Sequence, residues 1–432
     1  MKAFISITVY FFVMILMFSC DENANKENNK DHMKEQSIIT AKDILGNPNY
    51  LAISFGGYRY KDHGIEPSID QLKDDMKLLA AMGVKIVRTY KVHLPEASNL
   101  LKAISELKQK DPTFEMYVML GAWIDCKNAW TDQEPDHNEE SEANASQMLV
   151  AVYLANEYPD IVKILAVGNE AMVKWAPYHV RPGIVLKWVN HLQDLKKTGK
   201  LPKEIYITSS DNFASWGGGG PEYHVEDLEK LYRAVDYVSM HTYPVLDSHY
   251  NPDFWGVPDE EKDLPELEKI DKAMLRARDF AKSQYNNVSN YMKSLGIKKP
   301  IHIGETGWTT VSDDYFGPNG SKAADEYKQS IYYKHMRDWT NKEGISCFYF
   351  EAFNEPWKDA ASENGSENHF GLFNVDGQAK YALWELVDKG TFEGLTRNGN
   401  TITKTYNGDK EALIKEVLVP PTAKEIAQKS KE

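Results

Sequence analysis

The chain alternates short apolar runs with longer amphipathic stretches, and this alternation limits the folds that it can adopt. The runs have the length of strands, and the stretches carry apolar residues at the spacing of a helix packed on one face. The predicted strands are Leu51–Phe55, Val84–Thr89, Glu115–Leu120, Ile161–Val167, Glu204–Thr208, Val235–Met240, Pro300–Ile303 and Ile345–Phe350. The predicted helices include Ser68–Met82, Ser141–Glu157, Pro182–Lys196, Leu264–Leu295 and Ser321–Thr340. Eight strands, each followed by a helix, predict an α/β fold of the (β/α)8 TIM barrel type.

A doubly wound sheet is the competing α/β fold. Such a sheet, when it binds a dinucleotide, carries a Gly-x-Gly-x-x-Gly turn after its first strand. Leu51–Phe55 is followed by Gly56-Gly57-Tyr58, which does not fit that pattern. The barrel is therefore preferred, and no cofactor is expected.

The sequence before and after this alternation differs in composition. Lys2 precedes an apolar run and then Ser19-Cys20, a layout that is typical of a secretory signal and resembles a bacterial lipoprotein signal. We expect a signal peptide over residues 1–19, lipidation at Cys20 and a flexible polar tether over 20–36. The predicted catalytic domain covers 37–390, and 391–432 form a short C-terminal appendage.

These segments predict where the protein works. A lipid on Cys20 would hold an exported protein at a membrane, and the acidic pair after it favours the outer membrane, facing the cell exterior. A plain signal peptide with an incidental Cys is the alternative. The two remaining cysteines, Cys126 and Cys347, are too few for a disulfide framework and are expected to be buried free thiols.

The formal net charge of −14 limits the partners. A nucleic acid is not expected, because binding its phosphates requires clustered Lys and Arg. A neutral polymer fits the charge, and the protein is expected to be a monomer. The acids near Asp132 and Asp136 have no regular ligand spacing, so a solvated acidic loop is preferred to a metal site.

Two glutamates stand at the ends of predicted strands four and seven. Glu170 follows Ile161–Val167 and Glu305 follows Pro300–Ile303. The carboxyl ends of the strands carry the active site of a TIM barrel, and these two strands lie on opposite sides of it. Two facing carboxyl groups are the minimum equipment for cleaving a glycosidic bond. Each could instead be a carboxylate at a helix N-terminus, but both being so is much less favoured.

Other polar and aromatic residues follow the same strand ends, as a site for sugar hydroxyls and sugar faces would require. The candidates for substrate binding are Asn169, Tyr58, Tyr90, Trp123, His241, Tyr243, Trp308, Phe353, Glu355, Trp357 and Lys358. Core packing is the alternative for each aromatic ring, and a satisfied strand-end histidine is the alternative for His241. Arg88 is expected to be a buried hydrogen-bond donor that braces the carboxylate of strand seven, and a surface ion pair is the alternative. The insertion Lys127–Glu140, with Trp130, is expected to border the cleft.

Three segments resemble glycoside hydrolase family 17, within the superfamily of retaining barrel glycosidases. They are Val167-Gly-Asn-Glu170, Gly304-Glu-Thr-Gly-Trp308 and Phe353-Asn-Glu-Pro-Trp-Lys358. His369-Phe-Gly-Leu-Phe-Asn-Val-Asp-Gly377, leading to Lys380-Tyr381, is similar as well, so that the resemblance runs from Ile53 to Leu386. The turn Ile53–Tyr58 and the Pro-Trp pair before Lys358 depart from the pattern of plant members and leave the sugar subsites undefined.

The resemblance implies an activity and roles for individual residues. Family members cleave β-1,3-glucans such as laminarin. Glu170 would be the general acid/base, Glu305 the nucleophile, and Asn169 would hold the sugar 2-hydroxyl. Tyr243 would orient Glu305, and Glu355 and Lys358 correspond to polar residues that the family places near the catalytic centre.

The sequence leaves three functions open. The preferred one is a retaining endo-β-1,3-glucanase acting on laminarin-like polysaccharide. A β-1,3-glucan transglycosylase would use the same two glutamates, and a non-catalytic glycan-binding lipoprotein of the cell surface would need neither. Whether the enzyme cuts within chains or at their ends depends on loops that the sequence pattern does not define.

Overall fold

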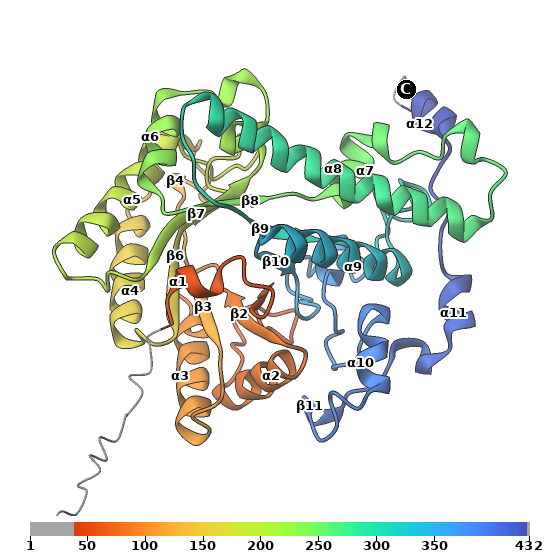
Figure 1. The fold of residues 1–432 in the computed structure, drawn as a ribbon, viewed down its shortest axis with the longest axis horizontal. Helices are drawn as coiled ribbons and strands as arrows, with labels where there is room; N and C mark the ends of the chain where they lie inside the picture. Colours follow the sequence, from red (N-terminus) through yellow and green to blue (C-terminus); the bar gives the residue numbers. More distant parts are fainter. Residues whose placement is uncertain (1–38, 430–432) are drawn as a thin grey trace, which may run out of the picture. The chain divides into compact units, whose positions relative to one another are not determined.

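A computed structural model describes residues 39–429, and the central feature of this part of the chain is a closed barrel of eight parallel strands (Figure 1). The strands are β1 (Leu51–Ser54), β2 (Val84–Arg88), β3 (Tyr117–Ala122), β6 (Val162–Asn169), β7 (Tyr206–Asn212), β8 (Val238–His241), β9 (Ile301–Gly307) and β10 (Cys347–Phe350). Neighbouring strands pair in chain order and β10 returns to β1 to close the barrel. The predicted (β/α)8 TIM barrel is confirmed.

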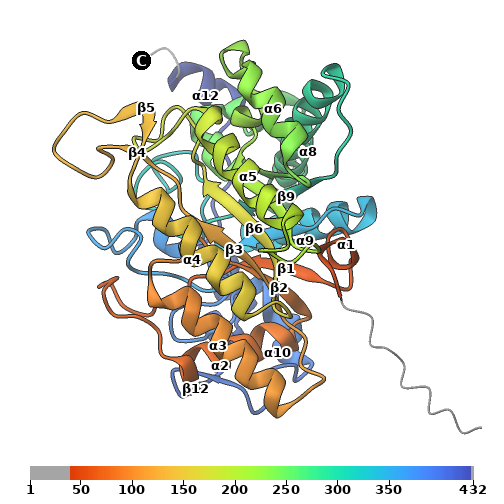
Figure 2. The ribbon, with the colours of Figure 1, turned by 90° about the vertical axis from the view of Figure 1, so that its left-hand side faces the viewer.

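A helix follows each barrel strand and packs outside it, as α3, α4 and α5 show in Figure 2. These helices are α2 (Ile69–Ala81), α3 (Pro95–Lys110), α4 (Ala143–Glu157), α5 (Pro182–Lys197), α6 (Glu226–Ala234), α8 (Glu266–Ser294), α9 (Glu326–Glu343) and α10 (Trp384–Asp388). In α2 the start is fixed by a capping box, in which Ser68 and Gln71 satisfy each other's backbone N–H groups. The apolar stripe of α2, including Leu72, Met76 and Leu79, is then buried.

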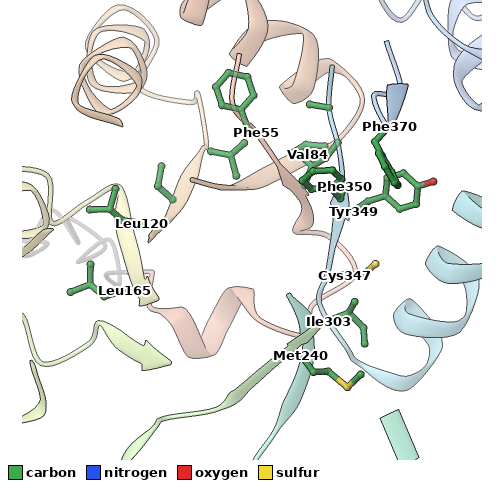
Figure 3. Close-up of a cluster of buried hydrophobic side chains, with 14 of the residues drawn as sticks. Phe55, Val84, Leu120, Leu165, Met240, Ile303, Cys347, Tyr349, Phe350 and Phe370 are labelled. Atoms are coloured by element: carbon green, nitrogen blue, oxygen red, sulfur yellow. The ribbon is translucent and has the colours of Figure 1, made fainter. Parts of the chain in front are cut away.

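The strands divide the core into two layers. Ala52, Ile86, Met119 and Ile164 belong to a cluster inside the barrel, which α1 (Ala41–Ile44) joins through Ile44. The alternate residues of the same strands face the helices in a larger cluster, part of which appears in Figure 3. A parallel strand covered on both faces must be apolar throughout, which explains why the strands read as continuous apolar runs in the sequence.

Several strands extend further than the sequence pattern predicts. β6 continues through Asn169, and β9 continues through Glu305 to Gly307. These polar residues still pair with the neighbouring strands, Asn169 with Ser210 and Glu305 with His241, although a shift in register precedes each pairing. The ladder of backbone hydrogen bonds therefore holds functional side chains that the hydropathy pattern would place in loops.

Two smaller elements stand beside the barrel. The insertion after β3 is a hairpin of β4 (Cys126–Lys127) and β5 (Asp136–Glu140), and α7 (Pro244–Tyr250) follows β8. The C-terminal segment contains β11 (Thr396–Arg397), β12 (Asn400–Thr401), α11 (Lys410–Lys415) and α12 (Ala423–Lys429). It packs on the barrel, where the side chain of Arg397 is fully buried.

Three predictions of the sequence analysis lie outside the described residues: the signal peptide over 1–19, the tether over 20–36 and lipidation at Cys20. Within residues 39–429, no helix combines the length and the hydropathy needed to cross a membrane. Cys126 and Cys347 are both buried free thiols.

Candidate active site

A cleft of about 460 Å³ lies at the carboxyl ends of the barrel strands. Most of the residues predicted for the site line it, namely Tyr58, Tyr90, Trp123, Asn169, Glu170, Tyr243, Glu305, Glu355, Trp357 and Lys358. They come from the ends of seven barrel strands that the sequence separates widely, and the closure of the barrel brings them together. This is the face on which barrel enzymes carry their active sites.

Glu305 is a buried carboxylate with specific partners. Arg88 Nη1 lies 2.5 Å from Glu305 Oε1, and the Tyr243 hydroxyl donates to Oε2 at 2.7 Å. Burial alone raises the pKa of this carboxyl, but the charges of His241 and Arg88 and the Tyr243 hydrogen bond outweigh it. The net effect holds the pKa of Glu305 below its usual value, so the group is ionised at neutral pH.

Glu170 stands directly after β6 and faces the same space. Its Oε1 lies 3.1 Å from His241 Nδ1, and that nitrogen lies 3.6 Å from Oε2 of Glu305. The Glu170 backbone has φ = +46°, a left-handed conformation that is uncommon for a residue with a side chain. Such conformations concentrate at functional sites, where the surrounding structure enforces them.

Arg88 connects the strands that carry the two glutamates. Besides Glu305, its guanidinium donates to Asn169 Oδ1 at 2.6 Å and to the Gly304 carbonyl at 2.8 Å. The side chain of Arg88 is 1% exposed, which matches the predicted buried brace. A planar guanidinium with several fixed donors holds both neighbours in one geometry, which a flexible ammonium would not do.

His241 lies beneath the two carboxyl groups and does not line the cleft. It is fully buried, and its Nε2 lies 2.7 Å from the Ser210 hydroxyl. The prediction that His241 binds substrate therefore needs correction. Its contacts make it a positioning group for Glu170 and Glu305.

The end of β10 adds a second charged cluster. Lys358 Nζ lies 2.6 Å from Glu351 Oε2 and 3.1 Å from Glu355 Oε2, and the Tyr58 backbone N–H donates to Glu355 Oε1. Burial raises the pKa of Glu351 well above its usual value even with Lys358 beside it. For Glu355 burial acts in the same direction, but Lys358 and several hydrogen bonds outweigh it and the pKa is lowered. The cluster thus presents a fixed mixture of donors and acceptors to the cleft.

Trp308 and Phe353 do not reach the cleft, contrary to the prediction that they bind substrate. Trp308 is 0% exposed and packs between Trp255 and Tyr332, and its Nε1 donates to a backbone carbonyl. Phe353 is 1% exposed and stacks on Phe373. Both rings turn toward the helices and loops around the barrel, because consecutive residues at a strand end point in different directions.

Other cleft residues lie outside the predicted binding set. Those with polar or aromatic side chains are His63, Lys91, Glu96, Trp130, Trp175, Asn212, Phe350, Glu367 and Phe370. Most come from connecting loops or, for Glu96, from the first turn of α3. Sequence signals exist for Trp130, in the insertion, and for Asn212, which follows the fifth predicted strand. His63 covers one face of Trp357, since the two rings stack with centroids 3.8 Å apart.

Among residues 39–429 no group of three or more His, Cys, Asp and Glu side chains is arranged to hold a metal ion. The cleft is lined by carboxyl groups, amino groups, hydroxyls and aromatic rings, and the Arg88 guanidinium contacts Glu305. This combination suits acid–base and nucleophilic chemistry on a polyhydroxylated substrate.

Comparisons with known proteins find related glycoside hydrolases. An endo-laminarinase from Formosa Hel1_33_131 has a solved structure that is 66% identical, with a TM-score of 0.88, covering 89% of this chain and 98% of that one. A glycoside hydrolase family 17 β-1,3-glucanosyltransferase from Rhizomucor miehei is 20% identical with a TM-score of 0.54, covering 77% of this chain and 96% of that one, and shows the shared fold.

Sequence relatives point in the same direction. A probable glucan endo-1,3-beta-glucosidase, btgC, from Aspergillus flavus is 25% identical over 386 residues, which are 84% of this chain and 47% of the relative. The chain thus spans about half the length of the curated relatives that it matches. The family model of the BtgE/BtgC glycoside hydrolase domain matches residues 52–371, from the first barrel strand to beyond the last. The chain therefore belongs to the BtgE/BtgC glycoside hydrolase family.

Proposed function

We propose that the protein is a retaining endo-β-1,3-glucanase, with Glu305 as nucleophile and Glu170 as general acid/base. The observation that carries this proposal is that both glutamates contact a single nitrogen, His241 Nδ1, at 3.1 and 3.6 Å. A retaining glycosidase needs its carboxyl groups about 5–5.5 Å apart, whereas an inverting one needs about 6.5–9.5 Å to admit a water. A shared contact atom favours the shorter separation.

The environments of the two glutamates support this division of roles. Arg88 and Tyr243 both direct donors at Glu305, which keeps its oxygens ionised and aimed. Within residues 39–429, Glu170 forms no ion pair with an Arg or a Lys, and its charged partner is His241. Its side chain is 27% exposed. A nucleophile must be charged and held in place, whereas an acid/base must exchange protons with substrate and water.

The reaction then proceeds in two steps. Glu305 attacks the anomeric carbon, the bond to the glycosidic oxygen breaks, and the proton of Glu170 passes to that oxygen. This leaves a glycosyl ester on Glu305 and an ionised Glu170. Glu170 next removes a proton from water, which attacks the anomeric carbon and releases Glu305 as a carboxylate. In this proposal Asn169, which accepts a hydrogen bond from Arg88, holds the sugar 2-hydroxyl.

The substrate class rests on the relatives and on the character of the cleft. The Formosa relative is an endo-laminarinase and the Aspergillus relative a probable glucan endo-1,3-beta-glucosidase. The cleft carries indole and phenol rings for sugar faces and charged groups for hydroxyls. Both properties support a neutral β-1,3-glucan as the polymer that is cut.

The proposal is tested by products and stereochemistry. The wild-type protein should release laminari-oligosaccharides from laminarin, and NMR should show the β-anomer as the first product. Glu305→Gln and Glu170→Gln should each lower kcat by at least about 10²–10⁴-fold. Calorimetry should show that both variants still bind laminarihexaose.

The matched control is Glu385→Gln, which changes an exposed glutamate on α10 and should leave the activity unchanged. Normal hydrolysis by Glu305→Gln, or an α-anomer as first product, would overturn the mechanism. Products longer than the supplied oligosaccharide would assign glucanosyl transfer instead.

We also propose that the enzyme is an exported, lipid-anchored monomer attached through Cys20, facing the exterior from an outer membrane. The support is the sequence of residues 2–20, with one basic residue, an apolar run and Ser19-Cys20. A glucan too large to enter the cell requires an enzyme outside it, which agrees with this placement.

A further inference from the structure

The hairpin of β4 and β5 carries an unusual tryptophan at the edge of the cleft. Trp130 lines the cleft, yet 67% of its surface is exposed. A tryptophan contributes a large apolar area, so an exposed one at a site is more informative than a buried one. Its backbone has φ = +65°, a left-handed conformation that strains any bulky residue.

Two contacts fix the Trp130 ring. The ring stacks on Tyr178, with centroids 5.2 Å apart and planes 25° apart. Its Nε1 donates to Asp125 Oδ2 at 3.1 Å. An exposed ring would ordinarily move among several rotamers, so these contacts hold it in one orientation before any ligand arrives.

The hairpin itself is tied to the barrel rather than free. The His137 ring stacks on His179 with centroids 3.6 Å apart, and its Nδ1 lies 2.8 Å from the His179 carbonyl oxygen. At the far end Glu140 accepts a hydrogen bond from Trp188 of α5 at 2.6 Å. The strained turn with Trp130 at its tip is therefore rigidly presented, and strain that is retained in this way points to function.

Trp130 belongs to the wall on the side of Glu170. The Tyr178 ring, on which Trp130 stacks, also contacts Trp123, and the Tyr178 hydroxyl donates to the backbone carbonyl of Asn169, the neighbour of Glu170. The opposite wall, with Tyr58, Glu355 and Trp357, comes from the ends of β1 and β10 beside Glu305.

The two proposed catalytic carboxyl groups act on different parts of a glucan. The acid protonates the oxygen that departs with the leaving sugar, whereas the nucleophile bonds to the sugar that is retained. We propose that Trp130 is a specificity-determining residue, a stacking platform for the glucose units on the leaving-group side of the cleaved bond. This inference rests on the proposed glucanase function. It adds the residue that binds the departing part of the glucan and, in transfer, the sugar that accepts the glycosyl group.

The test compares two substrates in the full-length protein. Laminarihexaose fills the leaving-group side with sugars, whereas β-laminaribiosyl fluoride leaves only fluoride there. Trp130→Ala should lower kcat/KM for laminarihexaose about tenfold, the effect of losing one aromatic contact of about 1.4 kcal/mol. It should leave kcat/KM for the fluoride unchanged, and it should reduce transfer from the fluoride to added laminaribiose.

Two variants serve as controls. Trp130→Phe keeps a ring for stacking and should retain most of the activity on laminarihexaose. Tyr153→Ala removes an aromatic side chain that is 63% exposed on α4, outside the cleft. This variant should leave kcat/KM unchanged for both substrates. Thermal unfolding of each variant shows that the fold is intact.

The outcomes separate the inference from the proposed function. Unchanged cleavage of laminarihexaose by Trp130→Ala would overturn the platform. An equal loss on both substrates would overturn it as well, because the residue would then support the structure rather than bind the leaving sugars. If the wild type turned over neither substrate, the glucanase proposal itself would fail.

Discussion

The chemistry proposed for this protein depends on how single residues set the charge of Glu305. Burial in the cleft opposes ionisation of this carboxyl, and the charges of His241 and Arg88 and the Tyr243 hydrogen bond reverse that effect. Arg88 contributes further by holding Asn169 at the same time. Removing one of these neighbours should therefore shift the acid limb of the pH profile of kcat/KM.

Tyr243→Phe tests this at the level of one hydroxyl. The variant removes the 2.7 Å hydrogen bond that stabilises the ionised form, so the pKa of Glu305 should rise. Since the nucleophile must be ionised, the acid limb of the kcat/KM profile should move to higher pH. Tyr90→Phe removes another cleft hydroxyl and keeps the Tyr243 contact, so the midpoint of its acid limb should match that of the wild type. An unmoved acid limb in Tyr243→Phe would contradict this account.

At the residue scale the sequence predicts the charged groups better than the rings. Glu170 and Glu305 each follow an apolar run. A carboxyl group is costly to bury among apolar side chains, so after a buried strand it is expected at the strand end. Trp308 is as close to its strand as Glu305 but turns into the core, because an indole is stable on either side. Which direction it takes depends on packing partners such as Trp255, far away in the sequence.

At the scale of elements, the C-terminal segment is joined to the barrel by a buried ionic cluster. Asp75 of α2 accepts from Arg59 at 2.9 Å and from Arg397 of β11 at 3.1 Å, and all three side chains are almost fully buried. Burial lowers the pKa of Arg397 to about 10 although Asp75 opposes this. The negative charge of one carboxylate thus compensates the positive charges of two guanidinium groups.

Asp75→Ala should destabilise the fold strongly. It leaves two buried cations without their anion, and breaking a buried pair in this way costs about 3–5 kcal/mol. The free energy of unfolding from urea titration, followed by tryptophan fluorescence, measures the effect. Asp70→Ala on the same helix removes an exposed carboxylate and is the control, expected to unfold like the wild type. Equal stability of Asp75→Ala and the wild type would show that the cluster does not hold the segment.

The element scale also shows what hydropathy patterns miss. All eight strands lie where the apolar runs predict them, because a strand covered on both faces must be apolar. Their functional ends, such as Ser210 and Glu305, continue the ladder with polar residues and so look like loops. The hairpin with Trp130 has no apolar run, and its position depends on contacts to α5 and to the loop with His179.

At the scale of the whole molecule, the barrel supplies the site, and we propose that the N-terminal segment determines the location. Residues 39–429 bring together strand ends that lie far apart in the sequence, so the cleft exists only in the closed barrel. Residues 1–38 lie outside this described part, and the expectation for them rests on sequence alone. The two parts can be tested separately, since activity reports on the first and membrane attachment on the second.

Cys20→Ser should release the enzyme from the membrane without changing its chemistry. One acyl chain binds a membrane only weakly, whereas two or more hold a protein stably, so removal of the lipidated cysteine should abolish retention. After fractionation of expressing cells, the wild type should sediment with the membranes and partition into detergent. The variant should remain in the soluble fraction, while kcat/KM on laminarihexaose stays the same. A soluble wild type, or a variant that still sediments, would show that Cys20 is not the anchor.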